Sequence, residues 1–412
     1  MPAIAVIGAQ WGDEAKGKIV HFLCRRADLC VRFNGGPNAG HTVVDAYGEA
    51  RLHQVPAGAL HPHCLGVLAH GVVLDLWALE AELAELAGQG RPPPRLLLSE
   101  RAHLILPYHR RREEREGAAQ ALGTTRKGIG PAYADRAARR GLRFLDLFHP
   151  ERVEERLRAE GGEEAAQVLA ELLRLRDRFS PAVGDARAAL AHALRAGQTV
   201  VFEGAQGTLL DLDWGTYPYV TSSPTTVHGI PWGTGVRVEL AAVVGVAKAY
   251  TTRVGAGPLP TEERGAVGER LRETGREYGA TTGRPRRCGW LDLVALRYAC
   301  AINGFTHLAL TKLDVLSGFS ELKVAVAYRW GRRCREEFPS STDELFHAEP
   351  VYETLPGWEE GIAGVREFSA LPKAAQRYVR FVEEFVGVPV ALVGTGARTE
   401  DVIVRAEILG YT

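Results

Sequence analysis

The sequence predicts an α/β fold with a large, mostly parallel central sheet that is flanked by helices and interrupted by helical and loop insertions. Apolar runs of strand length recur along the whole chain, and most of them are followed by a loop rich in glycine or polar residues. Segments with helical spacing of apolar residues lie between these runs. In an open sheet of this kind, ligands bind at the carboxyl ends of the strands.

The expected elements follow from these patterns in chain order. Strands are expected at residues 3–7, 28–33, 95–98, 199–202, 306–310 and 388–393. Residues 43–75 read as short strands and hairpins, and helices are expected at 18–24, 75–86 and through most of 150–197. Residues 123–131 are too rich in glycine and hydroxyl groups to form a helix or a strand.

Composition limits the class of protein. The chain has 412 residues, 46% of them hydrophobic, so a substantial core can form, and we expect one domain over residues 1–412. Fifty basic residues balance fifty acidic ones, which argues against a protein that coats polyanions or membrane surfaces. The six cysteines lack C-x-x-C spacing, and no targeting or membrane-spanning segment is evident. Free thiols and a cytoplasmic location are expected.

The stretch from Gly12 to Lys18 fits the first seven positions of the phosphate-binding P-loop. The eighth position should be Ser or Thr, which binds magnesium, but here it is Ile19. A plain strand–turn–helix corner would explain the pattern without a ligand. Alternatively, Asp13 supplies the missing oxygen, since Mg²⁺ needs only one or two carboxylates beside phosphate oxygens.

Further loops carry polar groups that suit an anionic ligand. Residues 34–42 form a Gly/Asn-rich loop that contains His41, and residues 203–208 follow a strand directly. Residues 123–131 are followed by Arg136, Arg139 and Arg140, although a solvated basic face would explain these arginines equally well. The loop at 279–287 carries three arginines and two threonines, which suit a carboxylate or phosphate.

A nucleobase site is suggested near residue 311. Thr311-Lys312-Leu313-Asp314 follows a buried strand, as does the tetrad with which many GTPases read guanine. Its carboxylate accepts hydrogen bonds from N1–H and the exocyclic amine, which adenine does not offer. A second strand end, Gly394-Thr395-Gly396, lies at the same expected edge of the sheet.

Taken together and in this order, these motifs resemble the adenylosuccinate synthetase family over the whole chain. The resemblance rests on residues 8–18, 38–42, 128–133, 202–207, 280–287 and 311–314. It implies a P-loop-GTPase-like fold, a homodimer, and a ligase of purine biosynthesis. The reaction joins L-aspartate to IMP through a 6-phosphoryl-IMP intermediate, with GTP as co-substrate and one Mg²⁺ per subunit.

The resemblance also implies roles for individual residues. Asp13 would be the base and His41 the acid, and Asp13 and the Gly40 carbonyl would bind Mg²⁺. GTP would be held by Gly12, Asp13, Glu14, Ala15, Lys16, Gly17, Lys18, Gly40, His41, Thr42, Arg286, Lys312, Leu313, Asp314, Gly394, Thr395 and Gly396. IMP would be held by Asp13, Glu14, Ala15, Lys16, Asn38, Ala39, Gly40, His41, Thr125, Gln206, Thr221 and Arg284, with Arg139 contributed across the dimer interface. Aspartate would be held by Ala280, Thr281, Thr282, Gly283, Arg284, Pro285 and Arg286.

Three positions depart from the family pattern. Ala15 stands where the phosphate turn usually has glycine, so the turn is strained if that position needs a positive φ. His21 replaces an acidic residue, and the loop at 394–398 is one residue shorter than usual. A GTP-binding regulatory paralogue without synthetase activity is the alternative, but such a protein would not need Asp13, His41 and the arginine loop together.

Overall fold

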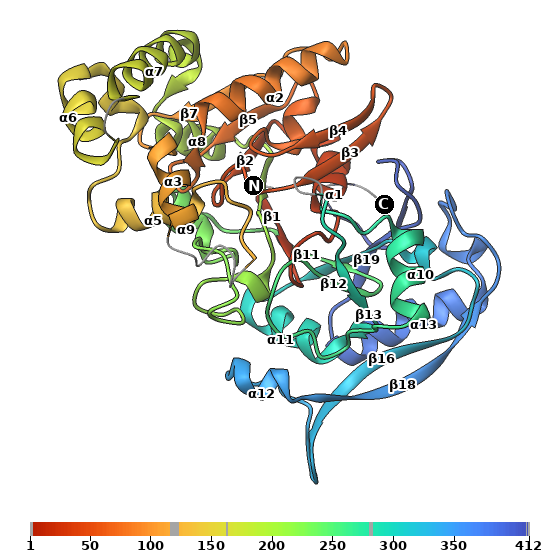
Figure 1. Ribbon diagram of the computed structural model, residues 1–412. Helices are drawn as coiled ribbons and strands as arrows, with labels where there is room; N and C mark the ends of the chain where they lie inside the picture. The colour runs from red at the N-terminus through yellow and green to blue at the C-terminus, as the bar shows by residue number, and fades with distance from the viewer. Residues whose placement is uncertain (1–2, 116–122, 162–163, 280–282, 409, 411–412) are drawn as a thin grey trace.

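The computed structural model describes residues 3–115, 123–161, 164–279, 283–408 and 410. At its centre lies a ten-stranded sheet (Figure 1). Every neighbouring pair of strands in it is parallel except β19 with β20 at one edge. The order across the sheet is β20 (Val402–Val404), β19 (Val390–Gly394), β15 (His307–Thr311), β11 (Ala242–Lys248), β1 (Ala3–Gly8), β10 (Val200–Glu203), β2 (Leu29–Arg32), β5 (Leu65–Leu68), β7 (Leu96–Ser99) and β9 (Val183–Gly184). The predicted strands and the predicted fold class are confirmed.

The central strand β1 shows why the sheet is parallel and covered on both faces. All six of its residues are buried. Ala5 and Ile7 belong to one hydrophobic core, whereas Ile4 and Val6 belong to a second core on the opposite face. Because successive side chains of a strand point to opposite faces, a continuous apolar run fits only a strand that is buried on both sides.

Helices of the expected spacing cover the two faces. Asp75 begins α2 (Leu76–Gly88) by accepting a hydrogen bond from the Ala78 N–H, and Asp292 does the same for α11 (Leu293–Asn303) through Ala295. The others are α1 (Lys16–Leu23), α3 (Pro107–Arg115), α5 (Ile129–Ala137), α6 (Pro150–Gly161), α7 (Ala165–Phe179), α8 (Ala186–Arg195), α9 (Gly229–Thr234), α10 (Ala266–Gly275), α12 (Thr342–Phe346) and α13 (Lys373–Val386). Figure 1 places α6 and α7 at the upper left, well away from β16 and β18.

Smaller sheets complete the structure. A second sheet, which no sequence pattern predicted, consists of β14 (Leu291–Asp292), β16 (Phe319–Trp330), β17 (Arg333–Arg335) and β18 (Glu349–Trp358). Its long strands β16 and β18 lie at the lower edge of Figure 1. Three two-stranded sheets pair β3 (His41–Asp45) with β4 (Gly48–Leu52), β6 (Val73–Leu74) with β8 (His103–Leu104), and β12 (Thr251–Arg253) with β13 (Arg287–Gly289).

The prediction for residues 123–131 was wrong at its carboxyl end, because α5 begins at Ile129. Gly128 adopts φ 75°, which turns the chain into the helix, and Pro131 lies in the first turn, where its missing N–H costs no hydrogen bond. Burial of Ile129 and Tyr133 stabilises the helix. The helical stretch at 150–197 is also interrupted by β9, which pairs with β7 at the edge of the sheet.

All six cysteines are free thiols. Five are buried, and Cys334 on β17 is exposed. Burial raises the pKa of Cys30 to about 12, so this thiol stays protonated. None of the helices in the described part of the chain combines the length and the apolar character needed to cross a bilayer.

His109 joins α3 to α5 in its neutral form. Its Nδ1 accepts a hydrogen bond from the Leu106 N–H at 2.9 Å, and Nε2 donates to Asp135 Oδ2 at 3.2 Å. Burial lowers the pKa of His109 to about 4, although Asp135 partly opposes this effect. Protonation of Nδ1 would therefore break the bond to Leu106.

We expect this histidine to make the protein less stable in acid. The unfolded chain binds the proton at an ordinary pKa of about 6.5, so the contribution of neutral His109 is complete above that pH and is lost as the pH falls towards 4. The loss should reach about 3 kcal/mol. Urea unfolding at about pH 7 and about pH 4.5 measures it, and His109→Gln should show a smaller difference between the two conditions. Equal differences would contradict the assignment.

Candidate functional site

A cavity of about 840 Å³ opens at the carboxyl ends of three neighbouring strands. It is lined by Trp11–Asp13, Ala15 and Lys16 after β1, by Asn38–His41 after β2, and by Gln206 after β10. This is the edge at which open parallel sheets bind their ligands. Residues 11–41 therefore supply two of its walls.

Glu14 holds the turn after β1 from the inside. Its carboxylate is fully buried and accepts hydrogen bonds from the backbone N–H groups of Gln10 at 3.0 Å and Gly12 at 2.8 Å. Lys16 Nζ lies 2.5 Å from the other carboxylate oxygen. A Cβ on Gly207 would lie 2.6 Å from this carboxylate, so glycine is needed there. The side chain of Glu14 thus faces the protein instead of the cavity.

Ala15 stands where the family usually has glycine, and it adopts a backbone conformation that is strained for any other residue. Its φ is 62° and its ψ is 35°, in the left-handed region. For a residue other than glycine this region costs about 1–2 kcal/mol. Gly12 and Asp13 in the same turn also have positive φ, at 81° and 61°. The packing around Glu14 holds the turn in this shape.

The two lysines of the P-loop-like pattern point to different places. Lys16 lines the cavity, whereas Lys18 Nζ donates to the carbonyl oxygens of Gly396 at 2.7 Å and Asp401 at 2.8 Å. In a P-loop the lysine after the second glycine reaches the phosphates. Here burial lowers the pKa of Lys18 to about 8, while Asp314 and Asp401 oppose that effect. Lys18 therefore fastens the 394–401 loop to α1.

His41 lies against a buried carboxylate that the sequence motifs contained but did not single out. Its Nδ1 is hydrogen-bonded to Glu203 Oε1, and Glu203 Oε2 accepts from the Ala57 N–H at 2.8 Å. Burial lowers the pKa of His41, and Glu203 only partly offsets this. Burial would raise the pKa of Glu203, but His41 and Arg32 outweigh it and lower that pKa. Ionised Glu203 requires the proton on Nδ1, so Nε2 presents a lone pair.

Glycine spacing brings this histidine close to the phosphate turn. A Cβ on Gly17 would lie 2.7 Å from His41 Cβ, so α1 packs on β3 only because residue 17 has no side chain. His21, one turn later on α1, stacks on His61 with ring centroids 4.1 Å apart. Burial lowers the pKa of His21 to about 3, so it is neutral. Neither His21 nor His61 lines the cavity.

Several buried polar atoms have no hydrogen-bond partner among the described residues. They include Asn38 Oδ1, His41 Nε2, both amide atoms of Gln206, and Asp314 Oδ1. Burying such atoms without a partner is costly, so each one requires an explanation, and a bound ligand is one. Asn38, His41 and Gln206 line the cavity. These orphan atoms mark where a polar ligand would complete the structure.

Asp314 belongs to a second part of the same sheet edge. β15 and β19 end at Thr311 and Gly394, and neither Lys312, Asp314 nor residues 394–396 line the cavity. Burial raises the pKa of Asp314, while Lys18 and Lys312 oppose the shift. Thr311 Oγ1 donates to the Glu14 carbonyl at 2.9 Å. The predicted guanine tetrad is therefore joined directly to the phosphate turn.

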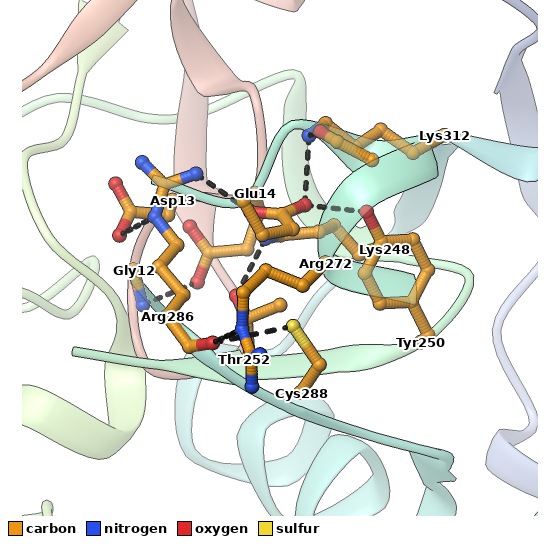
Figure 2. Close-up of polar contacts among 12 residues, drawn as sticks. Gly12, Asp13, Glu14, Lys248, Tyr250, Thr252, Arg272, Arg286, Cys288 and Lys312 are labelled. Atoms are coloured by element: carbon orange, nitrogen blue, oxygen red, sulfur yellow. Dashed lines mark hydrogen bonds and ion pairs between the residues drawn. The ribbon is translucent and has the colours of Figure 1, made fainter. Parts of the chain in front are cut away.

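The three arginines of the loop at 279–287 lie in different places. Arg284 lines the cavity, and Arg286 Nε lies 2.9 Å from Asp13 Oδ2 (Figure 2). Arg287 Nη2 instead donates to Glu262 at 2.6 Å, so it packs away from the site. Ala280, Thr281 and Thr282 lie outside the described residues.

Most of the predicted IMP residues line the cavity, and the exceptions are Glu14 and Arg139. Arg139 is exposed just after α5, and its neighbour Arg140 lines the cavity instead. Arg253 also lines it and was not predicted as a site residue. Its guanidinium is occupied by Thr216 Oγ1 and by the carbonyls of Ala256, Pro258 and Tyr219. The glycine-rich stretch at 251–258 was the sequence signal for this wall.

Comparisons with known proteins agree on one family. The family model described as adenylosuccinate synthetase matches residues 5–403. An adenylosuccinate synthetase of Desulforudis audaxviator is 48% identical over 425 residues, covering 99% of each chain. One of Thermus thermophilus is 50% identical over 413 residues, covering 97% of this chain and 98% of the other.

Solved structures show the same relationship. The structure titled fully ligated adenylosuccinate synthetase from Plasmodium falciparum superposes with a TM-score of 0.92 at 36% identity, covering 98% of this chain and 99% of that one. A cyanophage S-2L succinoaminodeoxyadenylate synthetase, bound to dGMP and dATP, has a TM-score of 0.64 at 21% identity. That second likeness concerns the fold alone.

Proposed function

This chain belongs to the adenylosuccinate synthetase family, and from that premise we propose how its residues carry out the GTP-dependent ligation of L-aspartate to IMP. The observation that carries the proposal is the set of orphan buried atoms on Asn38, His41, Gln206 and Asp314. The family resemblance assigns these residues to the binding of IMP, the transferred phosphate and guanine.

Asp13 is the proposed base. A hydroxyl-like group at C6 of the purine is a poor leaving group, so O6 must first be phosphorylated. Asp13 takes the N1 proton of IMP, O6 attacks the γ-phosphorus, and the bond to the leaving GDP oxygen breaks. The neutral aspartate amine then adds at C6, the C6–O6 bond breaks as phosphate departs, and the proton that the amine loses passes to the phosphate or to water. Asp13 lines the cavity, which supports its access to the purine.

His41 is the proposed acid that stabilises the phosphate bridge. In the free protein its Nε2 carries a lone pair, because Nδ1 is committed to Glu203. An approaching phosphate dianion favours the imidazolium form, and Glu203 stabilises the resulting charge. The histidine thus gains its proton when the ligand arrives.

The donor set around Asp13 fits Mg²⁺. The Asp13 carboxylate and Gly40 both face the cavity, and the described residues contain no group of three or more His, Cys, Asp or Glu side chains that would hold a metal alone. Asp13 and the Gly40 carbonyl would therefore hold one Mg²⁺ per subunit together with phosphate oxygens. When bound, the ion neutralises charge on the transferred group. Arg286 must release Asp13 to free this ligand.

The remaining contacts follow the two halves of the sheet edge. Lys16 and the Gly12–Lys18 amides hold the GTP phosphates, while Asp314, Lys312 and residues 394–396 hold guanine. Arg284 and Arg286, with residues 280–283, hold the carboxylates of aspartate. Residues from the whole length of the chain meet here, which supports a single domain.

We further propose a homodimer in which Arg139 reaches the IMP 5′-phosphate of the other subunit. Its exposure just after α5 supports this geometry, since a guanidinium fork suits a phosphate dianion. In a two-fold dimer the arrangement is reciprocal. Arg139→Leu should raise the KM for IMP about tenfold and leave that for GTP nearly unchanged. Steady-state kinetics measures both, with Arg158→Leu on the exposed face of α6 as the control.

A mixing experiment tests whether Arg139 acts across the interface. Arg139→Leu protein is combined with Asp13→Asn protein, and subunit exchange is verified. One site of the heterodimer then has an intact Asp13 and a borrowed Arg139, so activity at low IMP should reappear. If exchange occurs and the mixture never exceeds the sum of its parts, Arg139 acts within its own chain.

The proposed function is tested by the release of phosphate from GTP. The enzyme should release phosphate and form adenylosuccinate only when IMP and aspartate are both present. Omitting either one is the control. Steady GTP hydrolysis without them, and no adenylosuccinate with them, would contradict the proposed roles.

A further inference from the structure

We propose that Glu277 is a positioning residue of the ligation reaction, which holds Lys312 on the guanine side of GTP and Arg286 on its phosphate side. It lies just beyond α10 and is completely buried. The inference rests on the proposed function, because it assumes that Lys312 and Arg286 contact GTP.

Four side chains converge on this carboxylate. Oε1 accepts from Lys312 Nζ at 2.7 Å and from the Tyr250 hydroxyl, whereas Oε2 accepts from Arg286 Nη1 at 2.6 Å and lies 2.9 Å from Lys248 Nζ. Figure 2 shows Lys248 and Lys312 on the side of Tyr250 and Arg286 on the side of Asp13. Glu277 is thus the shared partner of residues from three separate segments.

The charges make the carboxylate indispensable to this arrangement. Burial would raise the pKa of Glu277, but Lys248, Lys312 and Arg286 outweigh it and lower the pKa far below the usual value. Lys248 has no exposed surface, donates to Thr252 Oγ1 at 2.5 Å, and has its pKa lowered to about 8 by burial. Neutral glutamine at position 277 would leave three cations facing one another.

Each contact of Glu277 positions a side chain that is proposed to bind GTP. Lys312 Nζ is held by Glu277 and by the Gly275 carbonyl at 2.7 Å, so its aliphatic stem is fixed beside Asp314. Arg286 donates from Nη1 to Glu277, and its Nε lies 2.9 Å from Asp13 Oδ2. One end of its guanidinium therefore stays anchored when the other end leaves Asp13 for phosphate or aspartate. Glu277 couples recognition of the base to recognition of the reacting groups.

The test is steady-state kinetics of Glu277→Gln, which preserves shape and removes charge. The KM values for GTP and aspartate should rise about ten- to a hundredfold, since charge-assisted hydrogen bonds to both binding groups are weakened. The KM for IMP should stay within about twofold, because Asn38 and Gln206 line the cavity whereas Glu277, Arg286 and Lys312 do not. A purely structural role would reduce the folded fraction, and with it kcat, but would leave all three KM values unchanged.

Two further variants keep the result decisive. Glu273→Gln changes an exposed carboxylate on α10, four residues before Glu277, and should keep the wild-type KM values. If Glu277→Gln does not fold, Glu277→Gln/Lys248→Met removes one buried cation with the buried anion, and the same KM pattern is expected. Unchanged KM values in a folded variant, or failure of both variants to fold, overturn the proposal. A wild-type enzyme that makes no adenylosuccinate would instead refute the proposed function.

Discussion

Asparagine in place of Asp13 is expected to lower kcat by about 10²–10⁴-fold through loss of the general base alone. Loss of the negative charge that would hold Mg²⁺ should lower it further. Asn tolerates the left-handed backbone found at residue 13, where φ is 61°, so the turn should keep its shape. Adenylosuccinate formation at saturating substrate measures the effect, and thermal unfolding checks the fold.

A matched control is Asp343→Asn, which makes the same change on α12, none of whose residues lines the cavity. It should keep wild-type turnover. If Asp13→Asn remained within a few-fold of wild type, proton removal from IMP would have to be assigned to another group.

The second large effect concerns the choice of nucleotide. Asp314→Asn should weaken GTP binding about 5- to 150-fold, because guanine donors lose a carboxylate acceptor in a buried site. Xanthosine triphosphate should bind the variant better, since its 2-oxo group accepts a hydrogen bond from the asparagine amide. Competition between the two nucleotides at fixed IMP and aspartate measures the preference. An unchanged preference would mean that guanine is read by other residues.

The parts of the fold that could be predicted depend on local sequence. The apolar run at residues 3–7 predicted a strand, and it is observed as β1, which extends one residue further to Gly8. The loops after β2 and β10 carry residues that line the cavity. These loops could be predicted because each one follows an apolar run that indicates a strand. Neighbouring residues are enough for inferences of this kind.

The parts that could not be predicted depend on contacts between distant segments. Glu203 reaches His41 across 162 positions in the chain, and Lys312 meets Glu277 across 35. The P-loop pattern indicates a phosphate lysine at Lys18, but that side chain points to Gly396 and Asp401, whose position only the folded structure reveals. The strands of the second sheet likewise depend on pairing partners such as β16 with β18.

The exposure of Cys334, with the other five cysteines buried, makes the chain suitable for selective labelling. A maleimide fluorophore added to the native protein should react at one position, on a strand that supplies no residue to the cavity. Separate pools labelled with a donor and an acceptor dye would then report exchange of subunits by energy transfer, while the enzyme retains its activity. The thiol that the fold leaves outside thus provides the probe for the assembly from which Arg139 is expected to act.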